Sequence, residues 1–128
     1  MMTNQLITTV ERIDAESQAL VYSQQVAAGA KLAAEIMVKD DLADTVVGVA
    51  LREGCLSRIE NPSSGWVSVV IYKYPFVGML VDEMHARPRV AGRPSMLAVW
   101  SEGKLFGYSD YEIAKYLEDH GYVDSALR

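Results

Sequence analysis

Small apolar residues recur at helical spacing over the first third of the chain. Residues 14–37 are rich in Ala, Gln, Glu, Leu and Lys, which favour helices, and Asp14 or Ser17 can cap their start. Residues three and four positions apart share a helix face, which here holds Ala19, Tyr22, Val26, Gly29, Ala33 and Ile36. The pattern predicts one long helix whose small side chains let another helix approach closely.

The middle of the chain gives a mixed signal. Asp40 or Asp41 can cap a second helix that continues through Val46 and Val49 towards Ile59, although glycines and β-branched residues interrupt it. Residues 61–65 (NPSSG) form the clearest turn. Residues 66–74 (WVSVVIYKY) are β-branched and aromatic, which favours a strand, but their unbroken apolarity also fits a buried helix.

The second half of the chain carries clear helix-start signals. Pro75 suits the first position of a helix over residues 76–85, because that position needs no backbone N–H. Ser95 can cap a short helix over 96–104. Ser109 and Glu112 match a capping box at the start of the last helix, and Gly121 suits the position after its end.

These elements predict a mainly α fold, a compact single-domain bundle of four to six helices spanning residues 1–128. The alternative is an α+β fold with a small sheet that uses residues 5–11 and 66–74. The length of 128 residues fits one domain. Half of the residues are hydrophobic and 23% are charged, which is typical of a globular protein and argues against disorder.

Charge and cysteine content narrow the functional classes. The net charge of -5 disfavours broad nucleic-acid binding. The single cysteine cannot form an internal disulfide, and no apolar segment has the roughly 20 residues of a membrane span, so we expect a cytoplasmic protein with no membrane partner.

A cationic segment interrupts the acidic chain. Arg87, Arg89 and Arg93 lie in a stretch without acidic residues between Glu83 and Glu102. Together with His85 and the amino-terminal end of the helix capped by Ser95, they could bind a phosphate or carboxylate ligand. The simpler interpretation is that the arginines pair with carboxylates of the chain itself or of a partner.

Other candidate groups carry little chemistry on their own. Asp82 and His85 would share a helix face, but two groups do not make a metal site, and a surface pair is the simpler interpretation. Cys55 lies between Arg52 and Arg58, yet a lone cysteine is more often a core residue. We therefore assign no catalytic residue, no metal ligand and no cofactor, and favour a non-enzymatic protein.

Aromatic residues crowd the carboxyl-terminal region. Tyr108, Tyr111 and Tyr122 lie beside turns and charges, whereas Trp100 and Tyr116 are expected in the core. Tyr, Trp and Arg are enriched at protein interfaces. The sequence thus predicts an interface formed by Tyr108, Tyr111, Tyr122, Arg89 and Arg93.

The functional prediction is a non-enzymatic protein–protein interaction module, such as a small bacterial regulatory or accessory protein. It would bind another protein or itself, as a homodimer. The alternative is a protein that binds a small anionic ligand, or a weakly marked enzyme, using His85, Arg87, Arg89, Arg93 and Ser95. A third interpretation is an acidic mimic that inhibits a nucleic-acid-binding protein, for which a charge of -5 is modest.

Overall fold

The computed structural model describes residues 2–87, 89 and 91–125. Over these residues the chain forms helices and three strands, in the order α1 (Met2–Ala27), β1 (Ala33–Lys39), the 3-10 helix η1 (Asp40–Leu42), α2 (Ala43–Arg52), β2 (Leu56–Ser63), β3 (Trp66–Tyr72), α3 (Pro75–Ala86), α4 (Met96–Leu105) and α5 (Asp110–Asp119). None of the described helices is long and apolar enough to cross a membrane.

The three strands form one antiparallel sheet in the order β1-β3-β2. Val69 of β3 pairs with Ile36 of β1 on one side and Ile59 of β2 on the other. The β2–β3 hairpin turns at Ser64 and Gly65, which both have positive φ angles, so the turn predicted at residues 61–65 is confirmed at its last two positions. Residues 66–72 of the ambiguous segment 66–74 form the central strand, and Tyr74 is already the N-cap residue of α3.

The predicted mainly α bundle is wrong, and the α+β alternative fits the structure. Residues 5–11, proposed as a strand, lie within α1, and the strands that pair with β3 are β1 and β2. The long helix predicted over 14–37 ends at Ala27, because Gly29 takes a left-handed φ of 82° that turns the chain. From Ala34 onward buried and exposed residues alternate, as in a strand.

The second predicted helix is also too long. It ends at Arg52 rather than near Ile59, because Gly54 adopts a φ of 80° and the chain reverses into β2. Leu56 and Ile59 keep the three-residue spacing of a helix, but they lie in β2, where both are exposed. Both predicted helices are too long for the same reason. In each case a glycine with a positive φ angle lies two residues after the observed end of the helix.

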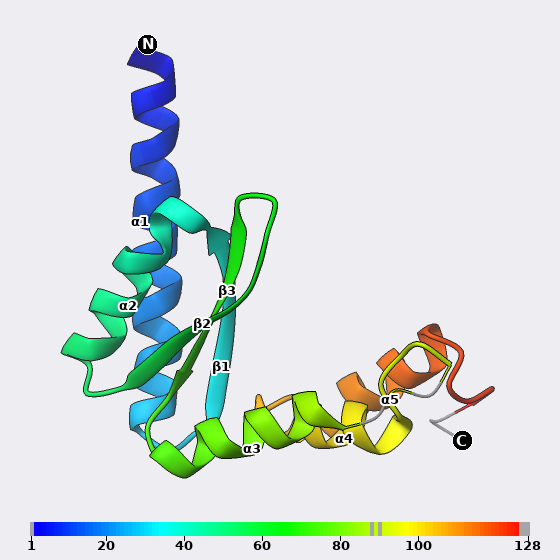
Figure 1. Ribbon diagram of the computed structural model, residues 1–128. Helices are drawn as coiled ribbons and strands as arrows, with labels where there is room; N and C mark the ends of the chain where they lie inside the picture. The colour runs from blue at the N-terminus through cyan, green and yellow to red at the C-terminus, as the bar shows by residue number, and fades with distance from the viewer. Residues whose placement is uncertain (1, 88, 90, 126–128) are drawn as a thin grey trace.

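One face of the sheet packs against α1 and α2 and forms the larger core (Figure 1). Val69 and Ile71 are fully buried there against Ala19 and Val26 of α1 and Val46 of α2. Of the small residues predicted to allow close packing of another helix, Ala19 is buried in this core, whereas Gly29 and Ala33 lie beyond the end of α1.

Cys55 belongs to the same core. Its Sγ donates a hydrogen bond to the carbonyl of Ser23 at 3.4 Å. Burial raises the pKa of the thiol above 9.0, and Glu53 acts in the same direction. A protonated, buried thiol is a poor nucleophile, so the structural role expected for Cys55 fits its surroundings.

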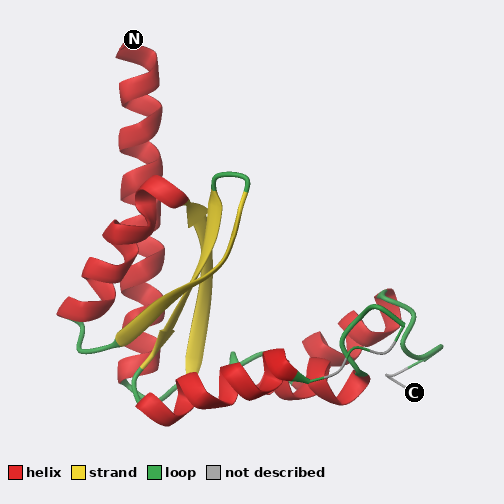
Figure 2. Cartoon of the chain, viewed as in Figure 1, coloured by secondary structure: helices red, strands yellow, loops and turns green. Residues whose placement is uncertain are grey.

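The other face of the sheet is only partly covered. Helices α3, α4 and α5 project from one end of the sheet as a separate helical arm (Figures 1 and 2). A smaller core attaches this arm, with Val70 of β3 packed among Val77 and Val81 of α3 and Leu105 and Phe106 at the end of α4. The arm and the uncovered sheet face enclose a concave corner.

The helix starts predicted in the arm are confirmed. Pro75 begins α3, the Ser95 side chain accepts from the backbone N–H of Ala98, and Ser109 and Glu112 form a capping box. Helices α4 and α5 meet closely at Gly103, where an added Cβ would lie 2.7 Å from Ile113.

Replacing Ser109 with alanine tests the capping box. The loss of the side-chain acceptor leaves a backbone N–H of α5 unsatisfied and should lower the free energy of unfolding by about 1 kcal/mol. Ser17→Ala is the matched control, because the structure places this candidate cap in the middle of α1, exposed, where alanine should be neutral or slightly stabilising. Urea unfolding measures both; equal effects would contradict the assignment.

Candidate binding sites on the helical arm

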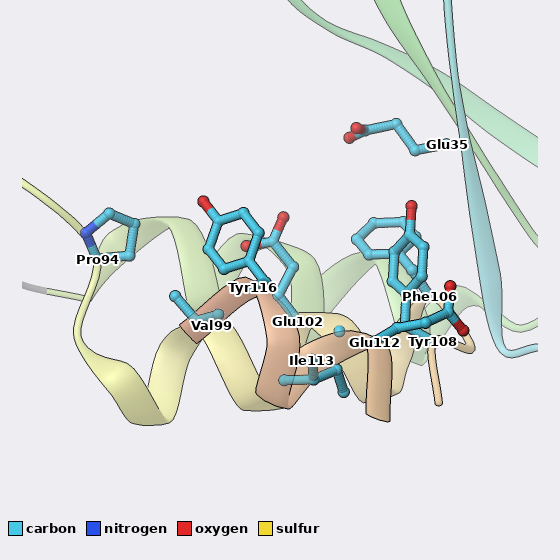
Figure 3. A pocket seen from close by; sticks show the side chains of 10 residues that line it. Glu35, Pro94, Val99, Glu102, Phe106, Tyr108, Glu112, Ile113 and Tyr116 are labelled. Carbon is cyan, nitrogen blue, oxygen red and sulfur yellow. The ribbon is translucent and has the colours of Figure 1, made fainter. Parts of the chain in front are cut away.

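A cavity of about 450 Å³ lies in the concave corner between β1 and the α4–α5 pair. We call it the corner cavity. Figure 3 shows Val99 and Ile113 at its base, Tyr116 on one side, and Phe106 and Tyr108 on the other. The remaining lining residues are Glu35 of β1 and Pro94, Glu102, Gly103 and Glu112 of the arm.

Glu102 stands in the middle of the corner. It is half-buried on α4, and no hydrogen bond or ion pair joins it to another residue of the described chain. Burial raises the pKa of its carboxyl group; His85 lowers it, and Glu35 and Glu60 raise it further. The corner thus holds a half-buried carboxylate that makes no ion pair with a described residue.

A second cavity, of about 360 Å³, lies on the other side of Glu102. We call it the arginine cavity. It is lined by Met84, His85, Arg87, Arg89, Pro94, Ala98 and Glu102. The structure therefore brings together three of the residues predicted to bind an anion, His85, Arg87 and Arg89, next to the first turn of α4.

The other two predicted ligand residues make contacts within the chain. Arg93 stacks on the ring of Tyr122 at 3.8 Å and donates to the carbonyl of His120. Ser95 caps α4. The Tyr122 hydroxyl also donates to the carbonyl of Pro94 at 2.7 Å. Arg93 and Tyr122 therefore connect the segment before α4 to the segment after α5.

The predicted interface residues are therefore spread over several contacts. Tyr108 and Tyr111 are well exposed at the start of α5, while Arg93 and Tyr122 face each other and Arg89 donates to the carbonyl of Gly92. Their part in an interface stays a prediction. Trp100 and Tyr116, expected in the core, are in fact exposed, Tyr116 by 46%.

Asp82 and His85 do not pair with each other. Asp82 contacts Arg58 of β2 at 2.9 Å, and His85 lies 3.7 Å from Glu60, which itself accepts from Arg58. These ion pairs link α3 to the sheet. Within the described part of the chain, no group of three or more His, Cys, Asp or Glu side chains is arranged to hold a metal ion.

Helix α3 carries an exposed apolar face. Phe76, Met79 and Leu80 lie three and four residues apart and are 51%, 68% and 38% exposed, whereas Val77 and Val81 on the opposite face are fully buried. Tyr74 extends this face by stacking on Phe76. We call these four residues the α3 stripe.

The comparisons with known proteins give no guide to these sites. No protein family model, no curated protein and no solved structure matches the chain.

Sequence reasoning missed the residues that define the corner cavity. Glu35 was assigned to a helix and Tyr116 to the core, and neither Glu102 nor Phe106 was selected as a site residue. Their proximity depends on how the arm meets the sheet, which no local pattern reports. The one available signal was that Glu102 is the only acidic residue between Glu83 and Asp110.

The pKa shift of Glu102 predicts a pH-dependent stability. Between the ordinary pKa of 4.5 and the raised native value, the folded state binds more protons than the unfolded state, so stability falls as pH rises through this window. Glu102→Gln removes that loss and should raise Tm at pH 7 by about 1–3 °C, with the gain lost near pH 4.

Thermal unfolding at both pH values measures this effect. Glu16→Gln, a change at an exposed carboxylate of α1 outside the arm, controls for the change in net charge. A gain in Tm that is independent of pH would show that burial does not destabilise the Glu102 carboxylate.

Proposed function

We propose that this protein is a non-enzymatic interaction module that pairs with a second copy of itself through the α3 stripe. The observation that carries the proposal is the exposure of four large apolar side chains along one helix face. A helix in a single domain ordinarily turns its apolar residues inward. Here α3 has apolar residues on both faces, and only one of them is covered by its own chain.

The total surface area supports an additional contact. The chain exposes 8280 Å², while a compact monomer of 14.1 kDa should expose about 6,700 Å². The excess of roughly 1,600 Å² arises because the arm and the end of α1 project from the body (Figure 1). A standard interface buries about 800 Å² on each partner, which is less than this excess.

The charges along α3 favour an identical partner. An antiparallel pair of α3 helices centred on Met79 would place Glu83 of each copy beside the start of the other copy's helix. That end has a positive dipole and follows the exposed Lys73. Each copy would then satisfy the other across a two-fold axis, which is the usual symmetry of homodimers.

Two further features belong to the proposal. Tyr108 and Tyr111, exposed on the same arm, are available as the rim of this interface or as the surface for another protein. The single cysteine, which cannot form a disulfide within the chain, favours a cytoplasmic location, and a regulatory or accessory role fits that location.

Met79→Glu tests the pairing of α3 helices. A charge at the centre of the apolar stripe cannot be buried without a partner and should weaken self-association about 100-fold or more. In sedimentation or light scattering, the wild type should show about twice the 14.1 kDa chain mass, and the variant should show the chain mass alone.

Leu51→Glu is the matched control, because Leu51 is 72% exposed on α2 and lies outside the arm. It should leave the mass unchanged. A wild type that stays monomeric at high concentration would refute the proposal. If Tyr111→Glu dissociates the dimer while Met79→Glu does not, the tyrosine surface is the interface and the assignment to α3 is wrong.

Binding of a small anion is a second candidate function, which the arginine cavity supports. Two guanidinium groups, an imidazole and the amino-terminal turn of α4 line one space, and each of them favours negative charge. Glu102 on its wall would oppose an anion, so the candidate ranks below self-association.

Inorganic phosphate serves as the probe for this second function. Titration should shift the backbone amide resonances of Ala98 and its neighbours, and the double variant Arg87→Gln/Arg89→Gln should weaken binding at least tenfold. Lys115→Gln, an exposed charge of α5 that pairs with Asp119, should not change it. Shifts that persist in the double variant would refute this site.

A further inference from the structure

We propose that the corner cavity binds an alkylammonium group, the charged end of a small organic cation or of a lysine side chain. The proposal is independent of self-association, because the α3 stripe does not line this cavity.

Carboxylates supply the charge of the corner cavity. Glu35 and Glu102 enter it from β1 and α4, and no hydrogen bond or ion pair engages either of them with another described residue. Figure 3 shows both carboxylates directed into the space between the sheet and the arm. No Lys or Arg lines the cavity. An entering cation would therefore meet negative charge from two sides.

Aromatic rings supply the walls. Phe106 and Tyr108 stand on one side of the cavity and Tyr116 on the other, as Figure 3 shows. The faces of such rings attract ammonium groups, and the attraction grows when the cation leaves water. An enclosure of several rings is the arrangement that proteins use for quaternary ammonium ligands.

Glu112 adds a fixed negative charge at the edge. Its carboxylate accepts from the backbone N–H of Ser109, and this hydrogen bond lowers its pKa. Glu112 is thus ionised and held in place by the capping box, at the side where Tyr108 enters the cavity (Figure 3).

The shape and chemistry of the cavity argue against other ligands. Three carboxylates repel a phosphate or carboxylate ligand. A bare metal ion would require several polar ligands close together, whereas the base of this cavity is Val99, Gly103 and Ile113. A volume of about 450 Å³ lies within the range of small-molecule sites. A cation with an apolar body matches all of these features.

Two cations, each with a neutral counterpart, test the proposal. Choline is compared with 3,3-dimethylbutan-1-ol, which has the same shape without the charge. Nα-acetyl-lysine methylamide is compared with its Nε-acetylated form. We expect at least one cation to shift the amide resonances of Glu102, Gly103 and Ile113 saturably, and its neutral counterpart to bind at least tenfold more weakly. The tighter of the two cations identifies the source as a free molecule or a protein side chain.

Variants locate the site. Glu102→Gln and Tyr116→Leu should each weaken cation binding about tenfold, since one removes a carboxylate and the other an aromatic wall. Glu16→Gln, which changes net charge equally on α1 and outside the cavity, should have no effect. Thermal unfolding of each variant verifies that it folds.

Three results would overturn the proposal. They are equal binding of a cation and its neutral counterpart, an equal loss of affinity in Glu16→Gln, and the absence of saturable binding for both cations to the folded wild type. The mass of the protein in solution is measured separately, so failure here is distinguishable from failure of self-association.

Discussion

The burial of β3 on both faces is the constraint on which the rest of the structure depends. Val69 and Ile71 pack into the core formed with α1 and α2, while Val70, between them in the sequence, packs against α3 and the end of α4. Successive residues of a strand point to opposite faces, so one apolar segment holds both the body and the arm. An unbroken apolar run is what such a strand requires.

Elements set by local interactions could be predicted from the sequence, whereas elements set by tertiary packing could not. Helix starts in the arm were predictable, because Pro75, Ser95 and Ser109 act through local hydrogen bonding and backbone geometry. The class of residues 66–74 was not, because an apolar run fits a strand or a helix until its neighbours are known. The strand β1 was hidden because Ala33 and Ala34 favour helices by propensity, yet tertiary packing buries them in a sheet.

The candidate sites also differ in whether the sequence could predict them. The grouping of His85, Arg87 and Arg89 was within reach of sequence reasoning because these residues are close in the chain. The corner cavity was not, because Glu35 and Glu102 are far apart in sequence and meet only where the arm turns back towards the sheet. Partial burial of the Glu102 carboxylate without an ion pair is energetically unfavourable, and such a site among aromatic side chains is where function is most reasonably sought.

The helical arm depends on the sheet for part of its own core. The core of helices α3 to α5 includes Val70 and Ala33 of the sheet. A fragment that contained only these helices would lack both side chains and would expose Val77 and Val81 to water. The arm is therefore not an independently folding unit. A chimaeric protein that contained the arm would also need β3, the central strand, to complete its core.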